Sequence, residues 1–158
     1  MTKWETDIGI PDINNIQILA KLFHISIDTL LSSDHHVQSL YESKIEYDID
    51  VLKDFGINLG TLGKVNIEGY EGEKLIIQLS SSIHKGLQKD FKIKLDDNKA
   101  RFDIDLETKE YITKDQRRDV NVSIFLPMQY IHKLECNVLP MSMSVSHIHS
   151  DSIELDIK

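Results

Sequence analysis

The sequence predicts a mainly β protein with a small helical segment at its N-terminus. Between residues 12 and 33, apolar residues recur at the intervals of three and four that line one face of a helix. From residue 57 to the end, apolar residues instead alternate with polar ones, as they do in half-buried strands. No helix-period segment long enough for a crossover interrupts this second part, which argues against a Rossmann-type or α/β-barrel fold. The second part is therefore all-β, either a solenoid or a sandwich.

The helical segment is predicted to hold two helices. In the first, Asp12 after Pro11 is a suitable N-cap, because its carboxylate can accept the free amide hydrogens of the first turn. The apolar face of this helix consists of Ile13, Ile16, Leu19, Ala20 and Phe23. Ser26 would cap a second, shorter helix with Leu30 on its apolar side. Residues 35–43 are predicted to be a linker, and the all-β repeat domain is expected to span residues 44–158.

The alternating part predicts about nine short strands, each with one buried face. Turns are expected at 60–63 and 69–72, where glycines cluster, and at 96–98, where Asp and Asn do. The predicted strands contain the apolar positions of 57–59, 65–67, 75–79, 91–95, 102–106, 120–126, 134–138, 141–145 and 153–157.

Composition limits the classes of function. The chain has 158 residues, 41% of them hydrophobic and 28% charged, which is typical of one globular domain with or without a small appendage. The net charge of -8 gives no general attraction for phosphate backbones. No apolar run long enough for a membrane span and no signal peptide are visible, so the cytoplasm is the expected compartment. Cys136 is the only cysteine, which excludes an internal disulfide, and it is interpreted as a small buried residue.

Residues 1–34 carry several motifs in a fixed order. They are Thr2-Lys3-Trp4-Glu5, then Pro11-Asp12 ahead of an apolar helix, then Phe23, Ser26-Ile-Asp28 and Leu30-Leu31. This order resembles the C-terminal half of a lambda-repressor/Cro-like (Xre-type) helix-turn-helix domain. The family's first two helices and most of its recognition helix have no counterpart here, so the chain is expected to begin with a partial domain.

The resemblance implies a DNA-binding transcriptional regulator. Thr2 and Lys3 match positions near DNA phosphates, and such contacts position a protein without specifying a sequence. A recognition helix reads bases near its own N-terminus, so DNA is the partner expected for a complete version and not for this chain alone. Regulators of this kind usually read two half-sites, which implies a homodimer. The residues that match packing positions of the domain are Trp4, Ile16, Leu19, Phe23 and Leu30.

A second resemblance covers residues 55–158. Its motifs are Ile57-x-Leu59, Gly63-x-Val65-x-Ile67, Val122-x-Ile124-x-Leu126-Pro127, and the closing Val145-x-x-Ile148-x-Ser150-x-x-Ile153-x-Leu155. They resemble a bacterial adhesin-like or cell-envelope β-repeat domain of otherwise unknown function, which implies a short right-handed β-solenoid. A stack of strands leaves its ends uncovered, and the apolar N-terminal helices are expected to serve as a cap.

No chemical site is predicted. His147 and His149 flank Ile148, so a strand would place both rings on one face, near Asp151. No third ligand stands at a motif spacing, and solvent-facing histidines are the preferred interpretation. The sequence contains neither a nucleophile elbow nor a glycine-rich phosphate loop, so neither an enzyme nor a cofactor is expected.

Two hypotheses of function follow. In the first, the chain is part of a transcriptional regulator whose β domain senses a ligand, dimerises or contacts a partner. In the alternative, DNA binding is absent and the protein is an interaction or cell-envelope-associated β module.

Overall fold

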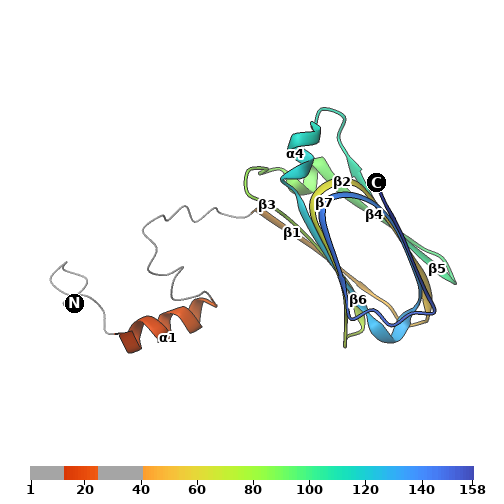
Figure 1. Cartoon of the computed structure of the whole chain (residues 1–158), viewed down its shortest axis with the longest axis horizontal. Coiled ribbons are helices and arrows are strands. Elements are labelled where there is room, and N and C mark those ends of the chain that lie inside the picture. The colour runs from red at the N-terminus through yellow and green to blue at the C-terminus, as the bar shows by residue number, and fades with distance from the viewer. Residues whose placement is uncertain (1–12, 25–40) are drawn as a thin grey trace. The chain divides into compact units, whose positions relative to one another are not determined.

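The computed structural model describes residues 13–24 and 41–158 (Figure 1). The chain divides into two units, residues 1–38 and 39–158. In the first, α1 (Ile13–Phe23) is the predicted first helix. Ile16 and Ala20 are buried and Leu19 is half-buried, whereas Ile18 and Leu22 are exposed. The expected DNA contacts Thr2 and Lys3 lie outside the described residues, as do Trp4, Leu30 and the packing of the Phe23 side chain.

The second unit is a β domain with short helical turns. Its elements, in chain order, are β1 (Tyr41–Asp48), β2 (Lys53–Tyr70), β3 (Lys74–Ser81), α3 (Leu87–Asp90), β4 (Phe91–Asp97), β5 (Arg101–Thr108), α4 (Lys114–Arg118), β6 (Asn121–Pro127), the 3-10 helix η1 (Met128–Tyr130), β7 (Ile131–Ser146) and β8 (Ser152–Ile157). None of the helices in the described part of the chain is long and apolar enough to cross a membrane.

Two long strands, β2 and β7, organise the domain. The first half of β2 pairs in parallel with β5 and β7, and its second half pairs in parallel with β6 and β7. We call the layer with the strand order β4-β5-β2-β7-β8 face A, and the layer with the order β1-β3-β6-β2-β7 face B. Figure 1 looks along the stack, where β2 and β7 curve round from one face to the other. The pairs β1–β3, β3–β6 and β4–β5 are antiparallel, so the sheet is mixed. Its central strands β5, β6, β2, β7 and β8 are parallel, which is typical of a solenoid and not of an antiparallel sandwich.

The mainly β class with a small N-terminal helix is confirmed, but the strands are longer and fewer than predicted. The segments 57–59 and 65–67 are one strand, β2, because Gly60 adopts a positive φ of 68° and lets the backbone bend without leaving its partner β7. The segments 134–138 and 141–145 are also one strand, β7, which follows β2 through the bend. The unpredicted strand β1 begins at Tyr41, inside the stretch 35–43 that was expected to be a linker.

The core lies between the two faces. Phe55 on β2 and Phe102 on β5 are fully buried side by side, with ring centroids 5.9 Å apart, and Tyr47 of β1 meets the edge of Phe102 at 5.1 Å. The other largest buried side chains are Phe91, Ile57, Leu62, Ile67, Leu75, Ile77, Ile104, Ile124, Leu126 and Leu134. All except Leu62 occupy inner positions of the alternating pattern, as the sequence predicts. Leu62 lies in the turn expected at 60–63, and that prediction is wrong because β2 continues through it.

One ion pair lies at the margin of this core. The ammonium group of Lys53, which is almost completely buried, contacts Asp97 and also donates to the Asn98 carbonyl oxygen at 2.9 Å. The Tyr47 hydroxyl donates to Asp97 at 3.0 Å. The hydrogen bond from Lys53, opposed by burial and assisted by Tyr47, holds the pKa of the Asp97 carboxyl below its usual value. The carboxylate of Asp97 therefore stabilises the folded state.

The substitution Asp97→Asn should lower the free energy of unfolding at pH 7 by about 1–2 kcal/mol, because Lys53 keeps its burial and loses its charged partner. A depressed folded pKa contributes stability above the unfolded pKa of about 3.9 and loses it as the pH falls through the folded pKa. Urea unfolding at several pH values should show the free energies of unfolding of the two proteins converging as the pH falls through the lowered folded pKa of Asp97. Asp48→Asn is the control, since the Asp48 side chain is 87% exposed. If the difference in the free energy of unfolding between wild type and Asp97→Asn is unchanged at acid pH, the prediction is wrong.

Candidate interaction site

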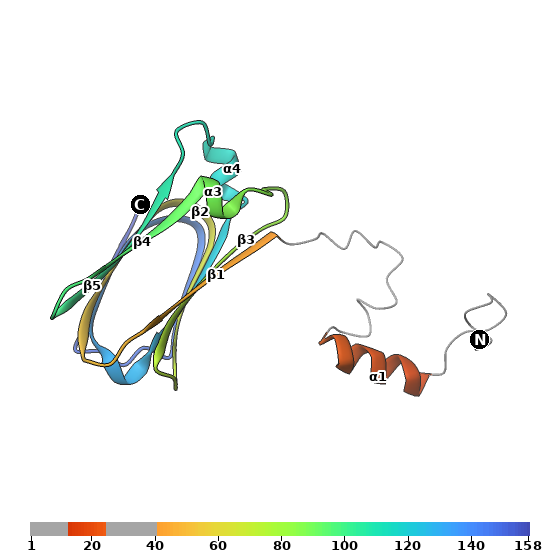
Figure 2. The same cartoon turned by 180° about the vertical axis from the view of Figure 1, so that it is seen from behind.

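One end of the solenoid has an unpaired edge. Within residues 41–158, β8 pairs only with β7, so the outer backbone N–H and C=O groups of β8 have no strand partner. Figure 1 looks onto this end, with the C-terminus near the viewer, and Figure 2 looks onto the opposite end, where β4 and β1 lie in front. An edge of this kind is a template for pairing with another strand.

The inner side of β8 is apolar and uncovered. Ile153, Leu155 and Ile157 are 45, 44 and 53% exposed, whereas their partners on β7 are buried. The reason is topological, because face A continues to β8 while face B stops at β7. In the second half of β7, Leu139 and Met141 are also exposed. We call β8 together with Leu139 and Met141 the open end. Its apolar area favours association at roughly 25 cal/mol per Å² buried.

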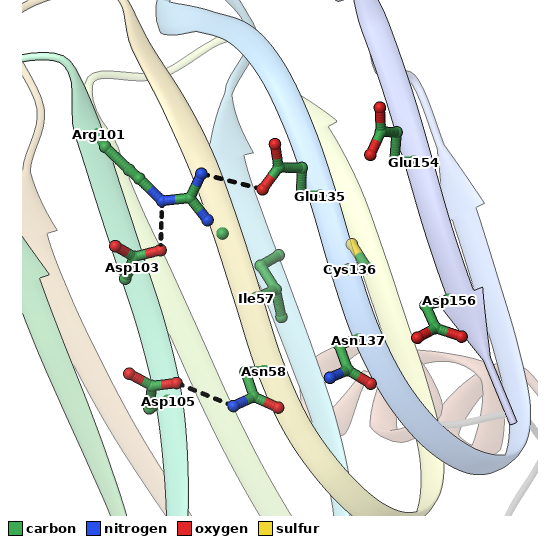
Figure 3. Close-up of a pocket in the computed structure, with 11 residues that line it drawn as sticks. Ile57, Asn58, Arg101, Asp103, Asp105, Glu135, Cys136, Asn137, Glu154 and Asp156 are labelled. Atoms are coloured by element: carbon green, nitrogen blue, oxygen red, sulfur yellow. Dashed lines mark hydrogen bonds and ion pairs between the residues drawn. The ribbon is translucent and has the colours of Figure 1, made fainter.

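The outer side of the same strands is polar and acidic. Because the strands are parallel and in register, their outward side chains form rows across β5, β2, β7 and β8 (Figure 3). One row is Asp103, Gly56, Glu135 and Glu154, and the next is Asp105, Asn58, Asn137 and Asp156. Together these rows line a shallow hollow of about 350 Å³.

A single arginine crosses this hollow. The guanidinium of Arg101 donates from Nε to Asp103 Oδ1 at 2.8 Å and pairs through Nη1 with Glu135 Oε2 at 2.9 Å. It lies over Gly56, where an added Cβ would be 2.6 Å from the guanidinium and 2.2 Å from Asp103 Oδ1. These hydrogen bonds, first that to Asp103 and then that to Glu135, raise the pKa of Arg101. Arg101 therefore ties β5 to β7 across β2 and neutralises part of the acidic surface.

Towards β8 the surface has more carboxylates than cations. Glu154 and Asp156 lie apart from the Arg101 ion pairs in Figure 3, and within residues 41–158 Asp156 is paired with Lys158 at 3.4 Å. Cys136 lies beneath the hollow, and burial raises the pKa of its thiol to about 12, so it is not a nucleophile at neutral pH. The chemistry available at this surface is charge attraction and strand pairing.

A second polar cluster fixes a loop at the end of β3. Asp119 accepts hydrogen bonds from the Ser82 hydroxyl at 2.6 Å and the Ser82 and Ile83 amides at 3.1 and 3.2 Å, and it also contacts the Ser81 hydroxyl. Burial acts to raise the pKa of Asp119, but the hydrogen bonds from Ser81, Ser82 and Ile83 outweigh it and the pKa is lowered. All of these contacts hold the loop against the residue that follows α4.

The histidine of this loop does not activate a serine. The His84 ring pairs through Nε2 with Asp90 Oδ2 at 2.8 Å, and only its backbone amide contacts the Ser81 hydroxyl. The hydrogen bond from Tyr111, opposed by burial and assisted by His84, lowers the pKa of Asp90. The serine, histidine and aspartate side chains of this cluster thus lack the nucleophile–base contact that a catalytic triad needs.

The candidate metal ligands do not share a strand face. His147 has a positive φ of 53° and β7 ends before it, at Ser146, so the expected alternation of His147 and His149 on one strand is wrong. The His147 ring lies 3.5 Å from Glu68, while His149 lines a separate hollow with Tyr70. Within residues 13–24 and 41–158, no group of three or more His, Cys, Asp or Glu side chains is placed to hold a metal ion.

Sequence reasoning found the carboxylates of the hollow but not their arrangement. The alternation predicted for 102–106 puts Asp103 and Asp105 on the polar side of the strand, and they face outward. Arg101 and Glu135 were not expected to meet, because their contact depends on the register of strands from distant parts of the chain. The exposed edge of β8 was likewise missed, since alternation alone does not say which strand is last in a stack.

Comparison with known proteins gives the fold. No family model matches the chain, and no curated protein does so either. A solved structure described as a "putative cell adhesion protein" from Clostridium sporogenes matches 73% of this chain with a TM-score of 0.51 and 14% identity. A "putative adhesin" from Bacteroides fragilis matches 72% of the chain at 10% identity, with a TM-score of 0.41.

This chain covers 56% of the first of these structures and 55% of the second, so it spans slightly more than half of their length. The first match agrees with the adhesin-like β-solenoid that residues 55–158 resemble. These comparisons give no support to the helix-turn-helix resemblance of residues 1–34 or to a role in transcription.

Proposed function

We propose that the β domain is a non-enzymatic interaction module and that its open end accepts a strand from a partner. The observation that carries this proposal is the state of β8, which combines an unpaired backbone edge with three exposed apolar side chains on its inner side. An added strand would supply the missing hydrogen bonds and cover Ile153, Leu155 and Ile157 at the same time. The expected class is therefore an interaction or envelope-associated β module, and the solved structure described as a "putative cell adhesion protein" has a similar fold.

The charges of the open end determine which residues the partner strand should carry. Inner positions must be apolar to pack on β8, and outer positions would lie beside Glu154 and Asp156. Opposite charges on neighbouring strands are favourable and like charges are unfavourable. The partner strand should therefore alternate apolar residues with Lys or Arg. The net charge of -8 would also attract a basic segment over a longer range.

Fluorescence anisotropy with two labelled peptides of about eight residues tests this proposal. Both peptides alternate Ile or Val with a charged residue, which is Lys in one and Glu in the other. The Lys peptide should bind the full chain at least about tenfold more tightly than the Glu peptide, because two like-charge contacts are replaced by attractive ones. Added salt should weaken binding of the Lys peptide and narrow this difference.

The Leu155→Lys variant should lose binding of the Lys peptide, since it places a charge in the centre of the apolar contact. Ile83→Lys is the matched control, because Ile83 is an exposed apolar residue of the loop after β3. If neither peptide binds, or if Leu155→Lys binds the Lys peptide as well as Ile83→Lys does, the proposal is wrong.

A further inference from the structure

The chain itself contains a strand of the kind that the open end requires. β4 is the edge strand at the other side of face A, and within residues 41–158 it pairs only with β5. Its inner side chains are Phe91, Ile93 and Leu95, and its exposed outer ones include Lys92 and Lys94. β4 thus alternates apolar and basic residues from Phe91 to Leu95, before the acidic Asp96. Lys94 also pairs with Glu107 of β5, an exposed contact that leaves its ammonium group accessible to a second carboxylate.

We infer that copies of this chain associate head to tail, with β4 of one copy added to β8 of the next. This contact rests on the proposed function, since it names the partner strand for the same open end. The strand directions fit, because β8, β7, β2 and β5 run parallel and β4 runs antiparallel to β5. A second copy that continues the stack in the same orientation would therefore add β4 antiparallel to β8.

One register satisfies both sides of the new pair of strands. On the inner side it places Ile153 opposite Leu95 and Leu155 opposite Ile93 of the second copy. On the outer side it places two acidic residues opposite two basic ones, Glu154 opposite Lys94 and Asp156 opposite Lys92.

Sliding the strands by two residues keeps the apolar side inward and breaks this match. In one direction Asp156 would pass the end of β4 and lie beside Asp90 of α3, and in the other Glu154 would lie opposite Asp96. Like charges directly opposite each other are destabilising, so the charge pattern selects a single register.

Adding a second copy to face A also extends face B by strand pairing. Each face has five strands, β4-β5-β2-β7-β8 and β1-β3-β6-β2-β7, so one copy advances both faces by the same distance, about 24 Å at a strand spacing of about 4.8 Å. In the second copy, β1 would then meet the second half of β7. The outward residues of β7 there are the uncharged Ser142, Ser144 and Ser146, so β1 brings no like-charge contact. Met141 would become covered.

A symmetric contact between two β8 strands fits poorly. Antiparallel pairing of β8 with its own copy, with the apolar side inward, places Glu154 opposite Asp156 or opposite Glu154 of the second copy. The head-to-tail contact is heterologous, so each added copy presents a new open end. The expected product is a chain of copies whose length grows with concentration, and not a closed dimer.

Charge reversal on each edge of the full-length chain tests this inference by light scattering after size exclusion. The first variant is Lys92→Glu/Lys94→Glu, and the second is Glu154→Lys/Asp156→Lys. Wild type should increase in mean mass between about 10 µM and about 1 mM, and each variant alone should associate at least about tenfold more weakly. A 1:1 mixture should recover association, because acidic β4 then faces basic β8 and basic β4 faces acidic β8. This recovery also shows that both variants are folded.

Three results would overturn the inference, and peptide binding shows whether the proposed function fails with it, as it does only in the third. In the first, the wild-type protein stays monomeric at about 1 mM but binds the Lys peptide. The edge of β8 then accepts a strand, but copies of the chain do not associate. In the second, the protein forms a dimer whose mass does not increase with concentration and whose dimerisation is unchanged in Lys92→Glu/Lys94→Glu, which indicates a symmetric contact. A monomer that binds no peptide and whose β8 amides are protected from hydrogen exchange points to the N-terminal segment as an intramolecular cap.

Discussion

Replacing Phe102 by alanine is expected to lower the free energy of unfolding by about 3–5 kcal/mol. Phe102 has no exposed surface and packs between Phe55 on the neighbouring strand and Tyr47 on the opposite face. Its removal would leave a cavity that the two curved strands cannot close, since interiors of this kind relax only partly. Urea unfolding followed by circular dichroism measures the loss.

Phe125→Ala is the matched control for this substitution. Phe125 is an outward, half-buried residue of β6 that meets Tyr70 edge to face at 6.4 Å. Its loss removes one aromatic contact and leaves no enclosed cavity, so we expect about 1 kcal/mol. Equal losses for the two variants would show that the space between the faces is not the core of the domain.

Replacing Asp119 by alanine is expected to cost about 3 kcal/mol, because it leaves two serine hydroxyls and two amides without their acceptor. One of these residues, Ser81, has no exposed surface, so water cannot replace the lost hydrogen bond to its side chain. Asp119→Asn should cost less, since one oxygen remains. The same unfolding experiment, with hydrogen exchange of residues 81–84, measures both effects.

Asp115→Ala is the control for Asp119, because the Asp115 side chain is 92% exposed and makes one contact with Arg118 at 3.4 Å. A surface pair of this kind contributes less than about 0.5 kcal/mol. If Asp115→Ala and Asp119→Ala destabilise the protein equally, the loop after β3 is not held by the carboxylate of Asp119.

The inner residues of the domain could be predicted from alternation, but the strand boundaries could not. Ile57, Ile104 and Leu134 lie inside because they follow the period of two. The alternation breaks at 60–63, where Leu62 is buried out of phase with Leu59 and Val65, and a break of this kind looks like a turn although the backbone continues as the single strand β2. β1 was missed because the buried Ser43 interrupts its apolar side and makes the segment look like a loop.

The candidate site depends on information that a single sequence lacks. The acidic residues of β8 and the basic residues of β4 are visible as charges, but their meaning comes from both strands being edges of face A. Edge positions follow from the order of strands in the sheet, and here that order differs from the order in the chain. The histidines show the reverse case, because His147 and Glu68 meet where a left-handed residue ends β7 and not on a strand face.

The position of β2 also has a consequence for how the protein folds. β2 is the second strand to be synthesised, but its partners all come later in the chain. It pairs with β5 and β6 along one edge and with β7 along the other, so both edges stay unpaired until those strands have been synthesised. One contact, between Asn66 and Ser144, joins residues 78 apart in the chain. Closing such long loops before contacts form is slow. Folding is therefore expected to complete only when β7 inserts along β2, and a ribosome-bound chain ending before β7 should remain open to proteolysis.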